Sequence, residues 1–476
     1  MERLRIIKLL ETAPSEDRLT VFGWVRTYRN DRFLAVNDGS TLKNLQLVVQ
    51  REDFDEEILK QLNTGAAIRA VGVLVESQGG GQSVELQVEE LEVLGGANPD
   101  EFPIQMKKHS LEFLREKAHL RFRTSTFSAV FRIRHLLQFA VHKFFHENGF
   151  FQLHTPIITG MDAEGAGEMF KVTTLDLDNV PKTEDGKTDF SQDFFGTQSN
   201  LTVSGQLEAE LAAMALGQVY TFGPTFRAEN SNTSRHLSEF WMIEPEIAFA
   251  DLKDDMKLAE DCLKYVFSYV LEHGEDDLKF LENREIQAEK QLPQKDRHEH
   301  SLCERLRIVV DSEFAHMTYT EVIEALRNSK PFKKKKFKYP CEWGDDLHSE
   351  HERWLVEKHV EGPVIVTDYP SEIKAFYMRA NDDGKTVAAM DVLVPGIGEL
   401  IGGSQREERL DVLKKKCADF NIPEDHVWWY LETRKFGSAK HCGFGMGFER
   451  LVMYCTGMSN IRDVIPFPRT PLSAEF

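Results

Sequence analysis

The spacing of apolar and polar residues is strand-like in the first part of the chain. Between residues 17 and 95, five short stretches alternate apolar with polar positions or are rich in β-branched residues, and NDGS and SQGGGQS provide turns. A helical stretch, EDFDEEILKQLNTG, precedes the fourth of these strands. Five strands with one helix in this place predict a small β-barrel of the oligonucleotide-binding type.

The pattern changes to long helices and further strands in the second part. Apolar residues recur at helical spacing from Phe127 to Glu147, Asn148-Gly149 ends this helix, and FFQLHTPII then reads as a strand. Helices and strands of similar length follow without the strict alternation of a doubly wound fold. The pattern therefore predicts an α+β fold in which an antiparallel sheet is flanked by helices.

These two patterns suggest a domain organisation. We expect an N-terminal barrel over residues 1–95 and a second domain over residues 126–476. The Pro- and Gly-containing residues 96–125 between them are expected to form a linker. Residues 280–345 are strongly charged, and we expect them to form a small, irregular insertion in the second domain.

Composition and charge restrict the class of protein. The 476 residues carry a formal net charge of −20, which argues against a protein that coats nucleic acid nonspecifically. The chain has neither the apolar run of a signal peptide nor an apolar stretch long enough for a membrane span, so we expect a cytoplasmic protein without a membrane partner. The basic run KKKKFK at residues 333–338 is more typical of a solvated loop than of a binding site.

Residues 226–249, FRAENSNTSRHLSEFWMIEPEIAF, resemble a hairpin that carries unusual charges. Counting by twos places Arg227 and Glu229 on one strand face, and His236, Phe240 and Glu244 on another. Cross-strand ion pairs on a solvated face would be one explanation. Because apolar neighbours indicate partial burial, an extended anion with an aromatic end fits better: cations bind phosphates, and the ring stacks on a base. We therefore predict a nucleotide site.

Two Gly-rich segments near the C-terminus have similar properties. GFGMGFERL, residues 443–451, matches neither phosphate-binding loop, but its alternate glycines would leave one strand face bare for a flat ring, next to Arg450. A Gly-rich turn that packs two elements is the alternative. In MDVLVPGIGELIGGSQR, Asp391 and Glu399 flank a Pro-Gly turn and form a plausible oxygen pair for Mg²⁺, and Arg406 follows. Two isolated carboxylates would otherwise be surface acids.

Together, these segments resemble the class II aminoacyl-tRNA synthetases. GFFQLHTP resembles their motif 1, FRAENSNTSRHLSEF motif 2 and GFGMGFER motif 3, in the expected order. Their spacing behind a barrel is similar to the aspartyl, asparaginyl and lysyl subgroup, and TVSGQLEAE, YPSEIKAFYMR and NIRDVIPFPRTP are most similar to the asparaginyl enzymes. The resemblance covers nearly the whole chain and is weaker in residues 172–195 and 280–345.

The resemblance implies a two-step reaction with ATP, Mg²⁺, asparagine and tRNA(Asn). By motif matching, Arg227 and Arg450 are the expected catalytic residues, because they would stabilise charge on the transferring phosphate. ATP would contact Arg227, Glu229, His236, Phe240, Glu399 and Arg450; Mg²⁺ would bind Asp391 and Glu399; asparagine would contact Glu164, Gln206, Glu244 and Arg406. One more residue separates Asp391 from Glu399 than in the aspartyl enzymes.

The resemblance also implies macromolecular partners. Phe33, Gln46 and Arg29 fall where this subgroup reads the anticodon, by stacking and hydrogen bonding to splayed bases. Without the resemblance, Phe33 would be read as a barrel core residue. The apolar helix and strand of motif 1 would pack against a second copy in a C₂ homodimer.

Three alternatives to an asparagine-specific enzyme fit this sequence less well. Aspartyl enzymes carry lysine where this chain has Ala209 and aspartate where it has Glu244, which favours asparagine. A binding-only paralogue would lose the motifs, whereas Arg227, His236 and Arg450 are present. A tRNA-independent asparagine synthetase would lack the barrel.

Overall fold

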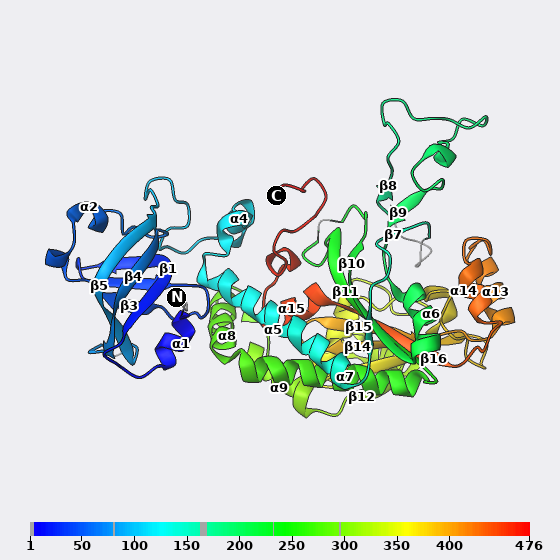
Figure 1. Ribbon diagram of the computed structural model, residues 1–476. Coiled ribbons are helices and arrows are strands. Elements are labelled where there is room, and N and C mark those ends of the chain that lie inside the picture. Colours follow the sequence, from blue (N-terminus) through cyan, green and yellow to red (C-terminus); the bar gives the residue numbers. More distant parts are fainter. Residues whose placement is uncertain (1–3, 80, 162–168, 232, 295–296) are drawn as a thin grey trace. The chain divides into compact units, whose positions relative to one another are not determined.

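The chain forms two compact units. The computed structural model describes residues 4–79, 81–161, 169–231, 233–294 and 297–476 (Figure 1). Contacts divide it into Met1–Phe131 and Arg132–Phe476. This division lies inside the long helix α5 (Ser125–Glu147).

The first unit contains a closed five-stranded barrel, as the alternation of residues predicts. Its strands neighbour one another in the order β1-β2-β3-β5-β4. Inward-facing residues such as Val21, Leu34 and Leu86 form its core. The strands are β1 (Arg18–Arg29), β2 (Phe33–Asn37), β3 (Leu45–Val48), β4 (Ala67–Glu76) and β5 (Val84–Gly95). The short helix α2 (Glu56–Leu59) lies before β4, and α1 (Ile6–Glu11) precedes the barrel.

The second unit is built on an eight-stranded sheet in the order β12-β13-β14-β15-β16-β11-β10-β6. The six inner strands pair antiparallel, as expected, but both edge strands, β6 and β12, pair parallel, so the sheet is mixed. The strands are β6 (Phe151–Leu153), β10 (Gln218–Phe226), β11 (Glu239–Ala248), β12 (Ala315–Thr318), β13 (Val364–Pro370), β14 (Thr386–Val394), β15 (Gly398–Gln405) and β16 (His441–Gly447).

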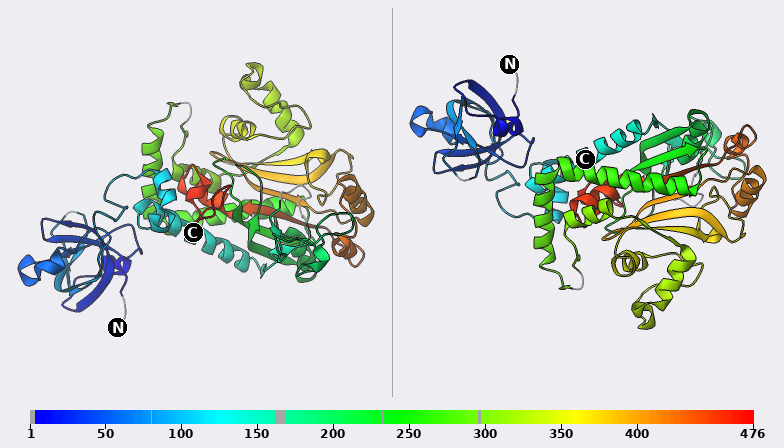
Figure 2. Two further views of the ribbon diagram at one scale, coloured as in Figure 1. Left: turned by 90° about the horizontal axis from the view of Figure 1, so that it is seen from above. Right: turned by 90° about the horizontal axis from the view of Figure 1, so that it is seen from below.

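Two long helices lie along one face of this sheet (Figures 1 and 2). In α5, the ring of Phe145 stacks on Tyr220 of β10 at 4.6 Å. Helix α7 (Leu252–His273) packs against β14, β15 and β16, and Asp251 begins it with a capping box that satisfies backbone donors of its first turn. Because these helices bury one face, polar side chains that point to the other face can form a site.

The expectation that residues 280–345 are irregular is wrong for most of the segment. The segment continues α8 (Glu275–Glu289) and then forms α9 (Leu302–Asp311), β12 and α10 (Tyr319–Asn328). Its charges lie mainly on the outer faces of amphipathic helices, and β12 extends the main sheet beside β13. The segment is therefore an integral part of the second unit.

Shorter elements complete the two units. A small sheet in the order β7-β9-β8 lies outside the main sheet. These elements are α3 (Leu111–Glu116), α4 (Ala118–Arg121), β7 (Ile158–Thr159), β8 (Lys171–Val172), β9 (Ser199–Leu201), α6 (Gln206–Leu216), α11 (Lys330–Lys333), α12 (Ser349–Trp354), α13 (Leu410–Asp419), α14 (Trp428–Thr433) and α15 (Phe448–Thr456). Among the described residues, no helix combines the length and the apolar character that a membrane crossing requires.

Candidate nucleotide and amino-acid site

The register of four inner strands gathers polar and glycine residues on one face of the sheet. Residues directly opposite in neighbouring strands share a face. Thr221 of β10 faces Glu244 of β11, Glu246 faces Gly443 of β16, and Gly443 faces Ser404 of β15. The same register extends through Gly402 to Asp391 of β14. Segments that are far apart in sequence therefore line one surface, opposite the face that α5 and α7 cover.

The charged part of the expected hairpin is a connection rather than a strand. Strand β10 ends at Phe226 and β11 begins at Glu239, so the assignment of Arg227, Glu229 and His236 to strand faces is wrong. The alternation is accidental, because this connection is rich in Ser, Asn and Thr, which favour turns. The N–H of Arg227 donates to the carbonyl of Ser238 at 3.0 Å and closes the loop at its base.

Within this connection, Arg227 lies beside the predicted base-stacking ring. Its Cζ is 5.3 Å from the centroid of Phe240, and both residues are half-buried. His236 and Glu229 are exposed further along the connection, and His236 Nδ1 hydrogen-bonds Thr233 Oγ1. The structure brings Arg227 and Phe240 into contact, whereas Glu229 and His236 lie on the exposed part of the loop between β10 and β11.

At Gly443 the Gly-rich strand β16 packs closely on its neighbour β11 rather than leaving a bare face. Gly443 must lack a side chain, because a Cβ there would meet the carbonyl of Pro245 and the carboxylate of Glu246. Gly447 ends β16, and α15 carries Arg450 in its first turn. Arg450 Nη1 donates to the carbonyl of Glu399 at 3.0 Å, which ties this helix to β15.

Two carboxylates converge over another glycine. An atom at the Cβ position of Gly402 would lie 3.4 Å from Glu399 Oε1 and 3.5 Å from Asp391 Oδ1, so both oxygens face one small space. Each is balanced by a cation: Lys374 Nζ lies 2.8 Å from Asp391 Oδ2, and Arg450 Nη1 lies 3.5 Å from Glu399 Oε2. Paired carboxylate oxygens around an open space are a suitable donor set for Mg²⁺. Lys374 was not predicted as a site residue, although YPSEIKAFYMR contains it.

Helix α12 adds residues that sequence reasoning missed. Glu352 Oε2 accepts from the N–H of Glu399 at 3.3 Å, and Ser349 Oγ accepts from Arg235 Nη1 at 3.1 Å. Burial and then the nearby charge of Glu399 raise the pKa of Glu352 to about 7. The helix therefore joins the carboxylate pair to the loop between β10 and β11. Nothing local marks Glu352, because only the packing of α12 against β15 brings it there.

At the other end of the face, Glu244 is held among donors. It is 4% exposed and accepts from Gly205 N at 3.0 Å, from Thr221 Oγ1 at 2.9 Å and from Ser204 Oγ. Gln206 begins α6, directly after these donors. The structure thus joins Glu244 to the segment that contains Gln206.

Arg406 lies in a fully buried network next to Glu244. Its guanidinium binds Glu246 with two nitrogens, Nε at 3.2 Å, and lies 3.8 Å from Glu210. Glu210 also accepts from Gln206 Nε2 at 3.0 Å and from Arg434 Nη2 at 2.8 Å. Although burial opposes the ionised form, a hydrogen bond with His441 and the charge of Arg434 hold the pKa of Glu210 below its ordinary value.

Sequence reasoning assigned no role to Glu210 or Glu246. Signals for both existed: Glu246 lies two residues from Glu244 on one strand face, and Glu210 lies one helical turn after Gln206. Glu164, the predicted ligand for the amino group, lies outside the described residues. The remaining predicted residues of the second unit lie on or above this one face of the sheet.

The predicted anticodon residues lie together on the barrel. Phe33 is half-buried and is not part of the barrel core, so its interpretation as a core residue is not supported. It faces Val48, and Ala35, two residues further along β2, faces Gln46, so Phe33 and Gln46 share a surface. Gln46 Nε2 donates to Glu85 at 3.0 Å, and Arg29 faces Phe33 across the pair β1–β2.

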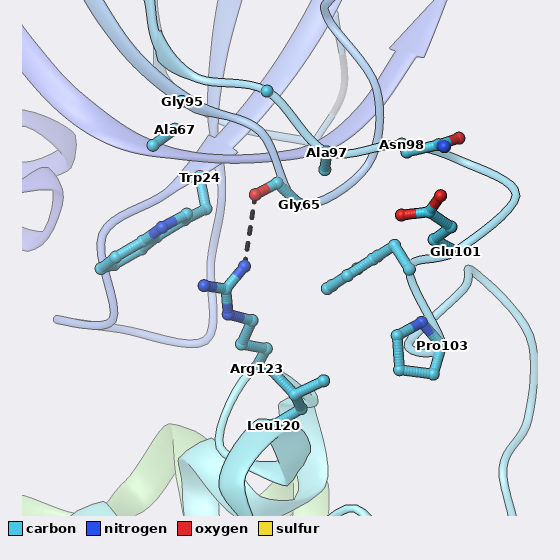
Figure 3. A pocket seen from close by; sticks show the side chains of 12 residues that line it. Trp24, Gly65, Ala67, Gly95, Ala97, Asn98, Glu101, Pro103, Leu120 and Arg123 are labelled. Atoms are coloured by element: carbon cyan, nitrogen blue, oxygen red, sulfur yellow. Dashed lines mark hydrogen bonds between the residues drawn. The ribbon is translucent and has the colours of Figure 1, made fainter.

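A cavity of about 420 Å³ lies elsewhere in the first unit (Figure 3). The guanidinium of Arg123 lies 5.9 Å from the ring of Trp24 and 5.6 Å from that of Phe102, and donates to the carbonyl of Gly65 at 3.3 Å. These contacts join the barrel to residues that follow it. These contacts explain how the side chains around the cavity are held, without a bound ligand.

Comparisons with known proteins identify the family of the chain. Residues 110–471 match the family model of class II tRNA synthetases (D, K and N), and residues 19–94 match an OB-fold nucleic acid binding domain. The chain is 58% identical to the asparagine–tRNA ligase of Cytophaga hutchinsonii, over 100% of both chains. It is 57% identical to that of Acetivibrio thermocellus over 96% of both.

A solved structure shows the same architecture. Asparaginyl-tRNA synthetase from Pyrococcus horikoshii, complexed with asparaginyl-adenylate, aligns with a TM-score of 0.83 and 30% identity over 100% of this chain and 99% of that one. The aspartyl-tRNA synthetase of Entamoeba histolytica, at 22% identity and a TM-score of 0.74, shares the fold. The chain therefore belongs to the class II tRNA synthetases of the D, K and N group and, within that group, to the asparagine–tRNA ligases.

Proposed function

We propose that the sheet face described above activates asparagine with ATP and transfers it to tRNA(Asn). In the first step the asparagine carboxylate attacks the α-phosphate, which forms asparaginyl-adenylate and releases pyrophosphate. In the second, a terminal ribose hydroxyl of the tRNA takes the acyl group and AMP leaves. The observation that carries the proposal is the strand register, which aligns Phe240, Glu244 and Asp391 on one face of the sheet. Arg227 lies against Phe240, and Arg406 binds Glu246 of the same face.

No side-chain nucleophile is needed, so the chain works by positioning and by stabilising charge. We assign Arg227 to the α-phosphate as charge develops on it. Phe240 and Arg450 would sandwich adenine, and His236 and Arg450 would meet the γ-phosphate. Glu229 would meet the adenine amino group or a neighbouring arginine once the loop closes over ATP, because it is exposed on that loop.

Asp391 and Glu399 would hold Mg²⁺. Their oxygens converge over Gly402, which leaves room for an ion. When bound, the ion would neutralise phosphate oxygens and fix their orientation. Lys374 and Arg450, which balance these carboxylates in its absence, could then turn their charge to the phosphates.

Glu244 and Arg406 would recognise the asparagine side chain. An ionised carboxylate offers about four acceptor positions, and three internal donors use three of them at Glu244. We assign the remaining position to an N–H of the asparagine amide, and Arg406 to its oxygen. Gln206 and Glu164 would bind the amino group. The alternative function, an aspartate–tRNA ligase, has less support. The relatives that match at 58% and 57% identity, over 100% and 96% of the chain, are asparagine–tRNA ligases.

The barrel would bind the anticodon through Phe33, Gln46 and Arg29.

Purified chain should charge a tRNA(Asn) transcript with asparagine. Phe33→Ala should lower kcat/KM for tRNA by roughly 5- to 150-fold, the equivalent of about 1–3 kcal/mol for one base stack, and should leave ATP–pyrophosphate exchange without tRNA unchanged. Absence of charging by the wild-type chain would refute the function. A parallel loss of exchange would instead show that the substitution damages the protein.

We also propose a homodimer. Large apolar side chains are exposed along motif 1: Phe139 of α5 is 51% exposed, Phe151 of β6 is 57%, and Ile157 and Ile158 follow at 43% and 41%. β6 is also an edge strand of the sheet. Exposed apolar residues beside an open sheet edge support a partner surface here.

Because tRNA charging serves translation, we expect the protein to act in the cytoplasm.

A further inference from the structure

The basic run that the proposed function leaves unused forms an exposed, uncompensated patch. We call residues 330–339, KPFKKKKFKY, the lysine segment. Its six lysines are all exposed: Lys330, Lys333, Lys334, Lys335, Lys336 and Lys338. Figure 2 shows this yellow-green part of the chain projecting away from the main sheet. Its concentration of positive charge contrasts with a chain whose net charge is −20.

Nearby carboxylates are engaged by other groups. Glu342 pairs with Arg327 at 2.6 Å. Asp345 accepts from the N–H of Glu342 at 2.7 Å, and Glu350 accepts from the backbone N–H groups of Lys338 and Tyr339 at 2.6 and 2.9 Å. By contrast, other lysines have carboxylate partners, for example Lys257 with Asp261 at 2.8 Å. Among the described ion pairs of this unit, none involves a lysine of the lysine segment.

The lysine segment is anchored rather than loose at its base. Phe332 and Phe337 pack against the core cluster that contains Tyr319 and Leu355. Ser329 caps α11 by accepting from the N–H of Phe332 at 3.2 Å. Because the rings are held inward, the lysines between them are displayed to solvent in a limited region. The positive charge is therefore concentrated on a segment that is already ordered, so that binding a partner would cost little backbone conformational entropy.

Contacts connect this patch to the active face. Glu350, which binds the backbone of the lysine segment, belongs to α12. The same helix contributes Ser349, which binds Arg235, and Glu352, which binds the backbone of Glu399. Tyr339 also stacks on His348, the residue before α12, at 3.8 Å. The lysine segment is therefore fixed within the second unit to a helix that borders the nucleotide site.

From this arrangement we infer that the lysine segment binds backbone phosphates of the tRNA acceptor arm. The 3′ end of the tRNA must reach the adenylate, so phosphates of the acceptor arm come close to the elements that border the site, of which α12 is one. Lysines supply most of the sequence-independent affinity of proteins for a polyanion, and exposed rings such as Tyr339, at 51%, suit an RNA surface. The inference rests on the proposed function and adds a second RNA contact, separate from the barrel.

The test replaces three lysines in the full-length protein. For K334S/K335S/K336S, kcat/KM for tRNA charging should fall by roughly 10- to 100-fold at low salt, mainly through KM. The slope of log(kcat/KM) against log[KCl] should become shallower by about 0.7–0.9 for each phosphate that the variant no longer binds. ATP–pyrophosphate exchange without tRNA should remain unchanged, because it needs no RNA.

A matched control and a mapping experiment separate the outcomes. K253S/K415S/K435S removes three exposed lysines elsewhere in the same unit and should leave the slope unchanged. Chemical probing of tRNA phosphates should show protection in the acceptor arm that the first variant abolishes. The inference would be overturned if the first variant left the slope unchanged or if the control changed it equally. It would also be overturned if protection were lost only in the anticodon arm, or if the first variant lowered ATP–pyrophosphate exchange. Failure of the wild-type chain to charge tRNA would instead contradict the proposed function.

Discussion

Arg227→Ala is expected to lower the rate of ATP–pyrophosphate exchange by roughly 10²–10³ while the protein stays folded. A donor aimed at charge that develops in the transition state contributes about 3–4 kcal/mol. Arg227 is held for this purpose at the base of the loop between β10 and β11, where its backbone binds Ser238 and its guanidinium lies over Phe240. The effect should appear mainly in kcat, because the charge is needed most when the phosphate is being transferred.

Circular dichroism and gel filtration should show that this variant keeps its fold and its oligomeric state. Arg327→Ala is a suitable control. It removes an exposed arginine that pairs with Glu342 in the same unit, and exposed pairs contribute little to stability. Near-normal exchange by Arg227→Ala would remove this residue from the mechanism. A comparable loss in Arg327→Ala would show that the assay reports general damage.

Glu244→Gln is expected to weaken asparagine activation and to reduce the discrimination against aspartate. Asparagine and aspartate are nearly isosteric, so the site must separate them by charge and by hydrogen-bond donors. The Glu244 carboxylate lies among three donors and would repel an aspartate carboxylate in a desolvated pocket. Sites of this kind discriminate by roughly 10⁴–10⁵, and loss of a charge-assisted hydrogen bond should lower asparagine activation by about 10- to 100-fold.

The measurement is the ratio of kcat/KM for asparagine and aspartate in pyrophosphate exchange. Thr221→Val provides the matched control, because it removes one donor to Glu244 and keeps the charge. It should lower asparagine activation without easing the exclusion of aspartate. An unchanged ratio in Glu244→Gln would rule out Glu244 as the determinant, even if overall activity fell.

The elements that the sequence predicts well are those with a regular local pattern. Strand β1, Arg18–Arg29, lies within the region where five strands were expected, because alternation and β-branched residues indicate a half-buried barrel strand directly. Helix α5 was predicted from its apolar spacing and its Asn-Gly end.

The failures have physical causes. Residues 227–238 alternate charges as a strand does, but Ser, Asn and Thr favour the backbone turns of a loop. The segment after α7 was expected to be irregular because it is strongly charged. Its local pattern did carry helix signals, because α9 and α10 are amphipathic and each begins with a capping box, Ser301 with Glu304 and Thr318 with Glu321. Glu352 and Lys374 enter the site only through the packing of α12 and the contact with Asp391, which no local sequence feature reports.

The most direct test is ATP–pyrophosphate exchange with each of the twenty amino acids in turn, on the wild-type chain and without tRNA. The site geometry predicts rapid exchange with asparagine alone, with aspartate slower by roughly 10⁴ or more at equal concentration. Preference for aspartate or lysine would contradict the assignment of Glu244 and Arg406 to the asparagine side chain. Absence of exchange with every amino acid would contradict the central claim that this face of the sheet activates an amino acid.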